Sequence, residues 1–275
     1  MPHNILVIGG SRHIGYYTSL RFLDAGANVT FLMRSPQAFD SDESIQKYMK
    51  SGSVNLVRGD GLVAKDVQRA WIEATKEAAV DLVLFTVGFT GNPKFQFTKG
   101  FVIHPNNLVT QCLLNVLCEM PKTSSLPKIV TLSASGVSRS SRAKVPFALR
   151  PVYGYLIQNP LQDKLGMERI IYHCSGWDWN TEDGEPGEDI MGKDWKHREG
   201  LPSPGTLQNA MIVRGAMFND GECRADSPEN RQPYRAGEGE VGGYFISRKD
   251  VAHFIFEAVT KNWEKYGNKQ VSIAY

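Results

Sequence analysis

The residues whose types suggest chemistry most directly lie near the start of the chain, where the apolar run 4–8 is followed by GGSRHIG. A continuous apolar run is typical of a parallel strand covered on both faces, and the residues after the loop recur at helical spacing. Glycines between such a strand and such a helix permit a tight turn and a close approach of backbone N–H groups to a diphosphate. The loop therefore predicts a dinucleotide site, and a glycine turn without a ligand is the alternative. The residues expected to bind the cofactor here are Gly9, Gly10, Ser11, Arg12, His13, Ile14 and Gly15.

Two arginines indicate which dinucleotide this would be. The usual spacing of the glycine motif places its middle glycine at Arg12, whose guanidinium can bind a phosphate. NAD enzymes generally present an acidic residue at the end of the second strand, where this chain has Arg34 followed by Ser35. These residues predict NADP(H) as the cofactor, unless Arg34 is only a solvated strand end. Asp60, in RGDG with Gly61, is expected either to accept a hydrogen bond from the adenine amino group or to belong to a plain turn.

Polar residues also follow the strands expected over 81–87 and 127–132. The carboxyl ends of parallel strands meet at one edge of a sheet, where ligands of open α/β folds bind. Ser133 and Ser135 could therefore polarise a substrate carbonyl, although capping of the following turn is an equal alternative. The residues expected to line the cofactor riboses are Thr86, Val87 and Gly88.

Alternating strand and helix periods position these residues. Short connections between them indicate βαβ units and a parallel sheet covered by helices on both faces. We expect an α/β Rossmann fold, a doubly wound parallel sheet with a small C-terminal substrate lobe, in which 1–150 form the NAD(P)-binding core and 151–275 the remaining core elements plus the lobe. Ser247 and Asp250 have the spacing of a helix N-cap. The predicted strands are 4–8, 29–33, 53–57, 81–87, 127–132, 211–214 and 270–274, and the predicted helices are 13–26, 42–50, 64–78, 105–119 and 247–261.

Several segments together resemble the atypical short-chain dehydrogenase/reductase superfamily, particularly its NmrA-like and related NAD(P)-binding branches. They are GGSRHIG, the Asp60 loop, TLSASGV, KLGMERIIYHCSGWDW, MIVRGAMFNDG and YFISRKDVAHFI, and they cover most of the chain. The resemblance implies a Rossmann core with a small substrate lobe. It leaves the reaction open, because relatives include reductases, epimerases and proteins that bind the cofactor only to sense redox state.

The chain departs from that superfamily at its usual YxxxK pair. Counting back from Lys164 places Pro160 at the position of the tyrosine that would transfer a proton. A partly desolvated lysine beside a cationic nicotinamide can itself act as an acid or base near neutrality, which makes Lys164 the leading catalytic candidate. The alternative is a ribose-binding or surface lysine that pairs with Glu168 one turn later. Tyr155 could supply a displaced hydroxyl or serve in aromatic packing.

The segment 180–208 interrupts the pattern of these relatives with a stretch rich in glycine, proline and charge. Long connections of this kind act as lids or binding loops, and its expected place beside the nicotinamide favours a substrate lid. A surface or dimer-contact loop is the alternative. Ile190, Met191 and Trp195 could fold the segment onto the body.

Composition excludes several classes of protein. A formal net charge of +2 over 275 residues argues against a nucleic-acid binder. Four scattered cysteines without a CxxC pair suggest free thiols in a reducing compartment, and the six histidines form no metal-binding pair. No apolar run has membrane-spanning length, and no signal-peptide pattern is present, so a cytoplasmic protein without a membrane partner is expected.

The leading functional interpretation is an NADPH-dependent reductase of a small organic carbonyl or enone, without a metal and with a homodimer as a possible assembly. The alternatives are a non-catalytic NADP(H)-sensing regulator and a non-redox isomerase or cyclase on the same fold.

Overall fold

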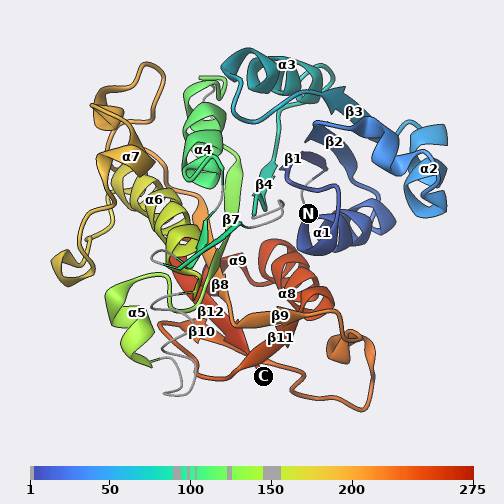
Figure 1. Cartoon of the computed structure of the whole chain (residues 1–275). Helices are drawn as coiled ribbons and strands as arrows, with labels where there is room; N and C mark the ends of the chain where they lie inside the picture. The colour runs from blue at the N-terminus through green and yellow to red at the C-terminus, as the bar shows by residue number, and fades with distance from the viewer. Residues whose placement is uncertain (1–2, 89–93, 98–99, 103, 123–125, 145–155) are drawn as a thin grey trace.

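The computed structural model describes residues 3–88, 94–97, 100–102, 104–122, 126–144 and 156–275. The centre of the fold is an eight-stranded sheet. Its strand order is β3-β2-β1-β4-β7-β8-β12-β10, with β10 antiparallel to β12 and the other neighbours parallel (Figure 1). Strands are added on one side of β1 up to β3 and on its other side from β4 onward, so the strand order reverses between β1 and β4, as in a doubly wound Rossmann fold. The strands are β1 (Asn4–Ile8), β2 (Asn28–Met33), β3 (Val54–Arg58), β4 (Leu82–Phe85), β7 (Lys128–Ala134), β8 (Ala210–Gly215), β10 (Arg235–Glu238) and β12 (Lys269–Ala274).

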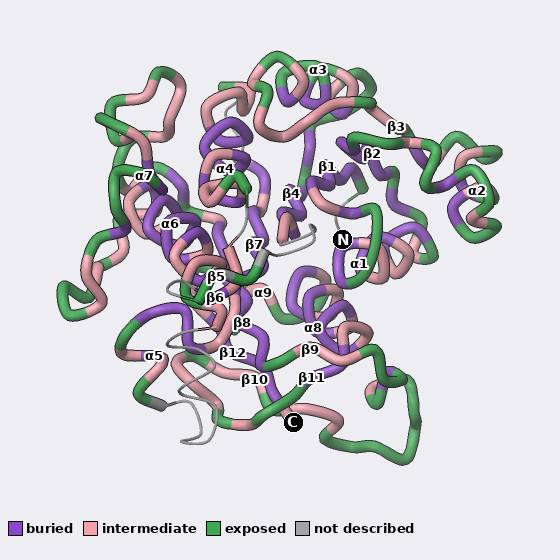
Figure 2. The backbone as a smooth tube through the Cα atoms, viewed as in Figure 1, coloured by how far each residue is buried: buried purple, intermediate pink, exposed green. Residues whose placement is uncertain are grey.

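Helices cover both faces of this sheet. Side chains of β1 alternate between the two layers, since Ile5 and Val7 pack in one core and Leu6 and Ile8 in the other. This explains why the strand is apolar throughout, and Figure 2 shows β1 and β4 buried along their length. The first layer contains α1 (His13–Asp24), α2 (Glu43–Lys50) and α8 (Arg248–Thr260), and the second contains α3 (Ala64–Ala74), α4 (Leu108–Cys118) and α6 (Gln158–Ser175).

The predicted α/β fold is confirmed, with differences at element ends. The helix expected to continue to residue 78 ends at Ala74, and the helix expected from residue 105 begins at Leu108. The N-cap at Ser247 is present, because its hydroxyl accepts a hydrogen bond from the N–H of Asp250 at 2.9 Å. Elements that the sequence pattern did not reveal are β5 (Lys94–Gln96), β6 (Gly100–Val102), β9 (Met217–Asn219), β10, β11 (Phe245–Ser247), α5 (Arg139–Lys144), α7 (Glu188–Met191) and α9 (Trp263–Tyr266).

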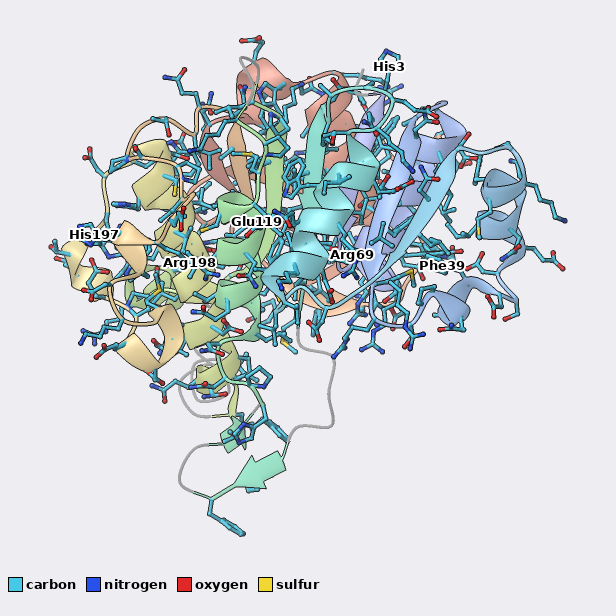
Figure 3. All side chains as sticks on the ribbon, turned by 90° about the horizontal axis from the view of Figure 1, so that it is seen from above. His3, Phe39, Arg69, Glu119, His197 and Arg198 are labelled. Atoms are coloured by element: carbon cyan, nitrogen blue, oxygen red, sulfur yellow. The ribbon has the colours of Figure 1, made fainter. Side chains whose placement is uncertain are left out.

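The segment 180–208 folds onto the outer side of α4 and α6. Ile190 and Met191 are each 3% exposed, and Gln111 of α4 donates to both of their carbonyl oxygens, at 2.9 and 3.0 Å. Figure 3 shows His197 and Arg198 at one edge of the molecule, with the labelled Phe39 toward the other. The expectation that apolar residues anchor the segment is confirmed.

Free thiols are also confirmed, because all of the cysteines, Cys112, Cys118, Cys174 and Cys223, lie in the described part of the chain and none is in a disulfide. Within the described ranges, no helix combines the length and the apolar composition needed to cross a membrane.

Candidate functional site

A pocket of about 620 Å³ lies where β1, β2, β4 and β7 end, beside the start of α1 and the first turns of α6. This is the position at which a doubly wound sheet binds its ligand. The pocket brings together nearly all of the residues singled out in the sequence. The predicted residues that line it are Gly9, Gly10, Ser11, Arg12, His13, Ile14, Gly15, Arg34, Asp60, Gly61, Thr86, Val87, Gly88, Ser133 and Lys164.

Two predicted features, Ser135 and the segment 180–208, are not part of this lining. The backbone N–H of Ser135 donates to the carbonyl oxygen of Gly215 at 2.8 Å. Tyr155 lies outside the described residues. The segment 180–208 contributes no residue to the described lining, so in this structure it does not serve as the expected lid. The reason is physical: its apolar residues are buried against α4 and α6 instead.

The glycine loop is packed tightly against the end of β4. A Cβ atom on Gly15 would lie 2.2 Å from the Thr86 hydroxyl oxygen, and one on Gly9 would lie 2.6 Å from the backbone nitrogen of Val87. The Thr86 hydroxyl in turn donates to the carbonyl oxygen of Gly9 at 3.0 Å. Glycine is therefore required at these positions by contact between β1, α1 and β4. The loop residues from Gly9 to Gly15 also line the pocket, as a cradle for a diphosphate requires.

The pocket wall beyond β2 and β3 carries Arg34 and Asp60. One carboxylate oxygen of Asp60 accepts a hydrogen bond from the N–H of Leu62 at 3.0 Å, while the N–H of Asp60 donates to Asp66 at 2.8 Å. Asp60 thus stabilises its own turn, as one of the two interpretations predicted. Since a carboxylate accepts several hydrogen bonds, this role leaves acceptor capacity facing the pocket.

Lys164 reaches the pocket from α6. Its Nζ donates to the carbonyl oxygen of Val87 at 2.8 Å and to that of Leu132 at 2.5 Å. Burial lowers the pKa of Lys164 to about 8, against the opposing effect of the carboxylates of Asp163 and Glu168. An ammonium group has three N–H donors, so one remains for a ligand in the pocket.

The alternative of a Lys164–Glu168 surface pair is wrong. Glu168 is fully buried and binds the guanidinium of Arg214 on β8 through two contacts of 2.9 and 2.6 Å. Nη1 of Arg214 also lies 3.3 Å from Oε1 of Glu240. Lys164 and Glu168 therefore have separate roles. The lysine lines the pocket, whereas the glutamate connects α6 to the sheet through Arg214.

Asp163, which the sequence pattern did not single out, connects α6 to α4. Its carboxylate accepts hydrogen bonds from the backbone N–H groups of Val109 and Thr110, at 2.7 and 2.8 Å. Burial raises the pKa of Asp163, although these two bonds oppose the rise. The cap of α4 thus comes from another helix, and no local motif indicates it. It fixes the turn of α6 that presents Lys164.

Ser133 is 1% exposed, lines the pocket, and its hydroxyl has no hydrogen-bond partner among the described residues. Thr131, two residues earlier on β7, also carries a buried hydroxyl without a hydrogen-bond partner among the described residues, but it does not line the pocket. Buried polar groups without partners are rare, so the hydroxyl of Ser133 is a group whose partner a ligand could supply.

Two pocket residues from the end of the chain were missed in the sequence. Phe218 on β9 and Arg248 at the start of α8 line the same pocket as Pro160 of α6. Both come from elements that join the site only through the tertiary fold. The remaining apolar lining on this side includes Phe101, Ile157 and Leu161.

Comparison with known proteins places this geometry in context. No family model matches the chain. The reductase pytE from Aspergillus terreus is 31% identical over 157 residues, which are 56% of this chain and 50% of that protein. The chain therefore spans about half the length of the curated relative it matches.

Solved structures share the fold over almost the whole chain. ChuY, an anaerobillin reductase from Escherichia coli O157:H7, matches with a TM-score of 0.59 and 16% identity, covering 98% of this chain and 96% of that one. A short chain dehydrogenase from Burkholderia cenocepacia in complex with NADP matches with a TM-score of 0.57 and 14% identity, covering 98% and 96%. The chain therefore shares the Rossmann-type fold of these solved structures, and the predicted resemblance is confirmed at the level of the fold.

Proposed function

We propose that the chain is an NADP(H)-dependent reductase of a carbonyl or enone group in a small organic substrate, with Lys164 as proton donor. The observation that carries the proposal is the ammonium of Lys164, held at the pocket by two backbone carbonyls, with a pKa of about 8. A group with this pKa is protonated at neutral pH yet gives up its proton readily. Two of the similar proteins, pytE and ChuY, are reductases.

The residues present fit a dinucleotide. The backbone of the glycine loop would hold the diphosphate and Arg34 the 2′-phosphate, which leaves the remaining N–H of Lys164 for the substrate. Arg34 at this position supports a preference for NADP over NAD, because a guanidinium matches a phosphate and an NAD site would present a carboxylate. When bound, the reduced cofactor supplies a hydride.

The chain itself would supply the proton and the substrate pocket. Lys164 would supply the proton that balances this hydride, to the carbonyl oxygen of the substrate or, for an enone, to the enolate. The unpartnered hydroxyl of Ser133 lies in the same wall and would donate a hydrogen bond to the substrate oxygen. Apolar residues such as Phe101 and Phe218 would exclude water from the other side.

A second candidate is a regulator that binds NADP(H) without turning over a substrate. Pro160 favours it, because this residue lines the pocket where the superfamily's proton-donating tyrosine would stand. The two candidates share cofactor binding and differ only in turnover.

The test combines binding and turnover. NADPH and NADH binding is followed by nicotinamide fluorescence, and NADPH consumption is measured against a panel of carbonyl and enone compounds. We expect NADPH turnover that falls by about 10²- to 10⁴-fold in Lys164→Met. Tight NADPH binding without turnover on any compound would contradict the reductase and favour the regulator.

The matched control is Lys128→Met. Lys128 is also half-buried, its Nζ donates to the carbonyl of Val259 at 3.0 Å, and burial lowers its pKa, but it lies at the opposite end of β7 and outside the pocket lining. This variant should retain turnover. An equal loss in both variants would indicate a general effect on folding.

A further inference from the structure

Basic side chains from the two ends of the chain meet beside the glycine loop. Arg12 and His13 come from that loop and Arg248 from the start of α8, and all three line the pocket. Burial and the charges of Arg248 and Arg12 lower the pKa of His13. The two arginines therefore supply the permanent positive charge here, and no part of the proposed function so far uses Arg248.

One carboxylate oxygen, Oδ1 of Asp220, lies between His13 of the glycine loop and Arg248 of α8. Nη1 of Arg248 lies 2.8 Å from Oδ1 of Asp220, and Nδ1 of His13 lies 4.0 Å from the same atom. The side chain of Asp220 is 69% exposed, whereas that of Arg248 is 22% exposed. The carboxylate thus approaches a recessed guanidinium from the solvent side, and an exposed ion pair of this kind is weak.

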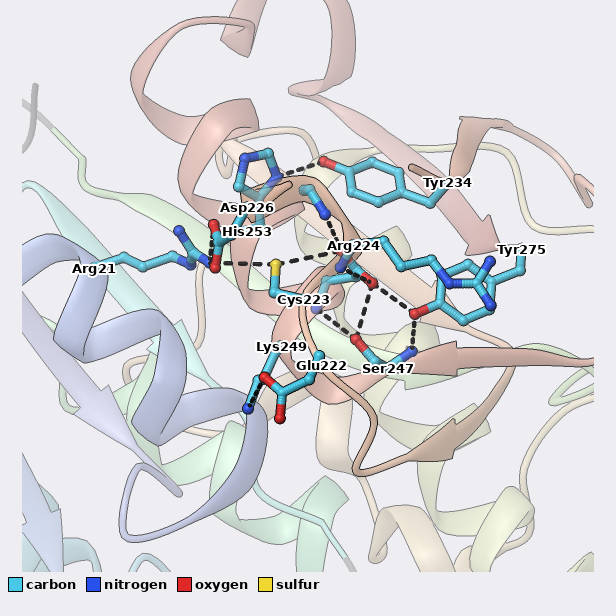
Figure 4. Close-up of polar contacts among 12 residues, drawn as sticks. Arg21, Glu222, Cys223, Arg224, Asp226, Tyr234, Ser247, Lys249, His253 and Tyr275 are labelled. Atoms are coloured by element: carbon cyan, nitrogen blue, oxygen red, sulfur yellow. Dashed lines mark hydrogen bonds and ion pairs between the residues drawn. The ribbon is translucent and has the colours of Figure 1, made fainter. Parts of the chain in front are cut away.

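The framework that holds Arg248 is, by contrast, extensively bonded (Figure 4). Asp250, two residues later, accepts from the N–H groups of Arg224 and Ala225 at 3.1 and 3.0 Å and from the hydroxyl of Tyr275 at 2.6 Å. Arg21 of α1 binds Asp226 of the same loop at 2.8 Å. These contacts fix the start of α8 to α1, so the guanidinium of Arg248 has a defined place next to the glycine loop.

Such a site suits an anion inside the pocket. A dinucleotide carries two charged groups, a 2′-phosphate in NADP and a diphosphate in both NADP and NAD. Arg34 follows β2, whereas Arg12 precedes α1 and Arg248 shares the Asp220 oxygen with His13 of α1, so both lie where the diphosphate of a doubly wound fold binds. The guanidinium of Arg248 is therefore placed for the diphosphate and not for the 2′-phosphate.

We propose that Arg248, together with Arg12, binds the diphosphate of the dinucleotide cofactor, and that Asp220 is a counter-ion which the diphosphate displaces from Arg248. This rests on the proposed function only for the identity of the ligand and requires no turnover. It makes Arg248 a cofactor-binding residue and Asp220 a competitor that weakens cofactor affinity.

The test measures dissociation constants of NADPH and NADH by fluorescence titration. We expect Arg248→Gln to weaken both by about 10- to 100-fold and by the same factor, since both share the diphosphate. Asp220→Asn should tighten both by about 3-fold, because a competing carboxylate is removed. Lys249→Gln is the matched control, since Lys249 is the next residue, pairs with the exposed Glu222 and does not line the pocket; both constants should stay unchanged.

Three results would overturn the assignment. Unchanged dissociation constants in Arg248→Gln, with a raised KM for the organic substrate, would make Arg248 a substrate-binding residue. Weaker cofactor binding in Asp220→Asn would make Asp220 a structural partner, and this variant decides the matter if Arg248→Gln does not fold. A wild-type chain that binds neither dinucleotide would refute the proposed function as well, which distinguishes that failure from the first two.

Discussion

The Nζ of Lys164 lies 2.8 Å from the carbonyl oxygen of Val87 and thereby joins the middle of α6 to the residues that follow β4. A second carbonyl, of Leu132 on β7, receives another of its hydrogen bonds. These partners are neutral, so they orient the ammonium without balancing its charge. Burial consequently lowers the pKa of Lys164 to about 8, although Asp163 and Glu168 oppose the shift.

The first prediction concerns the pH dependence of turnover. If the ammonium of Lys164 donates the proton in reduction, kcat should be level below about pH 7 and fall about tenfold per pH unit well above the lysine pKa of about 8. In the oxidation direction the neutral amine accepts the proton, so kcat should rise over the same range. Initial rates in buffers of constant ionic strength test this. A reduction rate independent of pH across that range would remove Lys164 from the chemical step.

The second prediction concerns stability. Lys164 titrates at about pH 8 in the folded chain and near its ordinary pKa of about 10.4 when unfolded. Between these values the unfolded chain binds more protons, so this lysine makes the free energy of unfolding rise with pH. The difference between wild type and Lys164→Met, measured by urea unfolding, should increase by at most about 1.4 kcal/mol per pH unit there.

Comparison with the variant is necessary because other groups titrate in the opposite sense. Burial raises the pKa of Cys112 and Cys174, so deprotonation of these thiols in the unfolded chain lowers stability as the pH rises. Both proteins share that loss, and the difference isolates the lysine. A difference that does not vary with pH would show that Lys164 has an ordinary pKa.

The third prediction uses the two unpartnered hydroxyls of β7. Ser133→Ala and Thr131→Val each remove a buried hydroxyl that has no partner in the part of the chain that the structure describes, so each should raise the free energy of unfolding by about 1 kcal/mol. Only Ser133 lines the pocket, so only Ser133→Ala should also reduce turnover, by about 10²-fold. Parallel unfolding and rate measurements test both effects. Equal turnover in the two variants would exclude a substrate contact by Ser133.

Local patterns were sufficient for the strands from β1 to β4, for the helices between them and for the cofactor loop. The apolar run of β1, the glycines and α1 are adjacent in sequence, and each constrains the next, so Gly9, Gly15 and Arg34 could be placed without tertiary information. Lys164 was found because its helix resembles a known motif.

Long-range contacts account for what was missed. Asp163 caps a helix some fifty positions earlier in the chain, and Arg248 reaches the pocket only because α8 packs beside α1. The segment 180–208 has the composition of a free loop, but burial of Ile190 and Met191 outweighs that composition. No periodicity within these segments indicates which surface they contact.

The fourth prediction tests cofactor preference. Arg34→Gln should weaken NADPH binding by about 10- to 100-fold and leave NADH binding nearly unchanged, since only NADPH carries the 2′-phosphate. Lys50→Gln, an exposed basic residue at the end of α2 and outside the pocket lining, is the control. Fluorescence titrations of both cofactors provide the measurement. An equal loss for NADPH and NADH would assign Arg34 to another part of the dinucleotide.

The last prediction concerns the buried pair of Glu168 and Arg214, in which the two side chains are 0% and 8% exposed. Arg214→Met leaves the carboxylates of Glu168 and Glu240 without their cation, so the free energy of unfolding should fall by about 3–5 kcal/mol at pH 7. An uncompensated carboxylate takes up a proton more readily, so the loss should be smaller at pH 5.

Substituting Glu168 together with Arg214 separates two contributions to the free energy of unfolding: the cost of an unpaired buried carboxylate and the contribution of the ion pair. Because well-packed apolar residues often replace a buried ion pair without loss, Glu168→Leu combined with Arg214→Met should recover the part of the stability that the lone Glu168 carboxylate cost, whereas Glu240 still lacks its cation. Lys261→Gln, which removes an i,i+4 pair with Glu257, should change stability by less than about 0.5 kcal/mol. If the double variant is as unstable as the single one, the pair itself stabilises α6 against β8, and the position of Lys164 then depends on it.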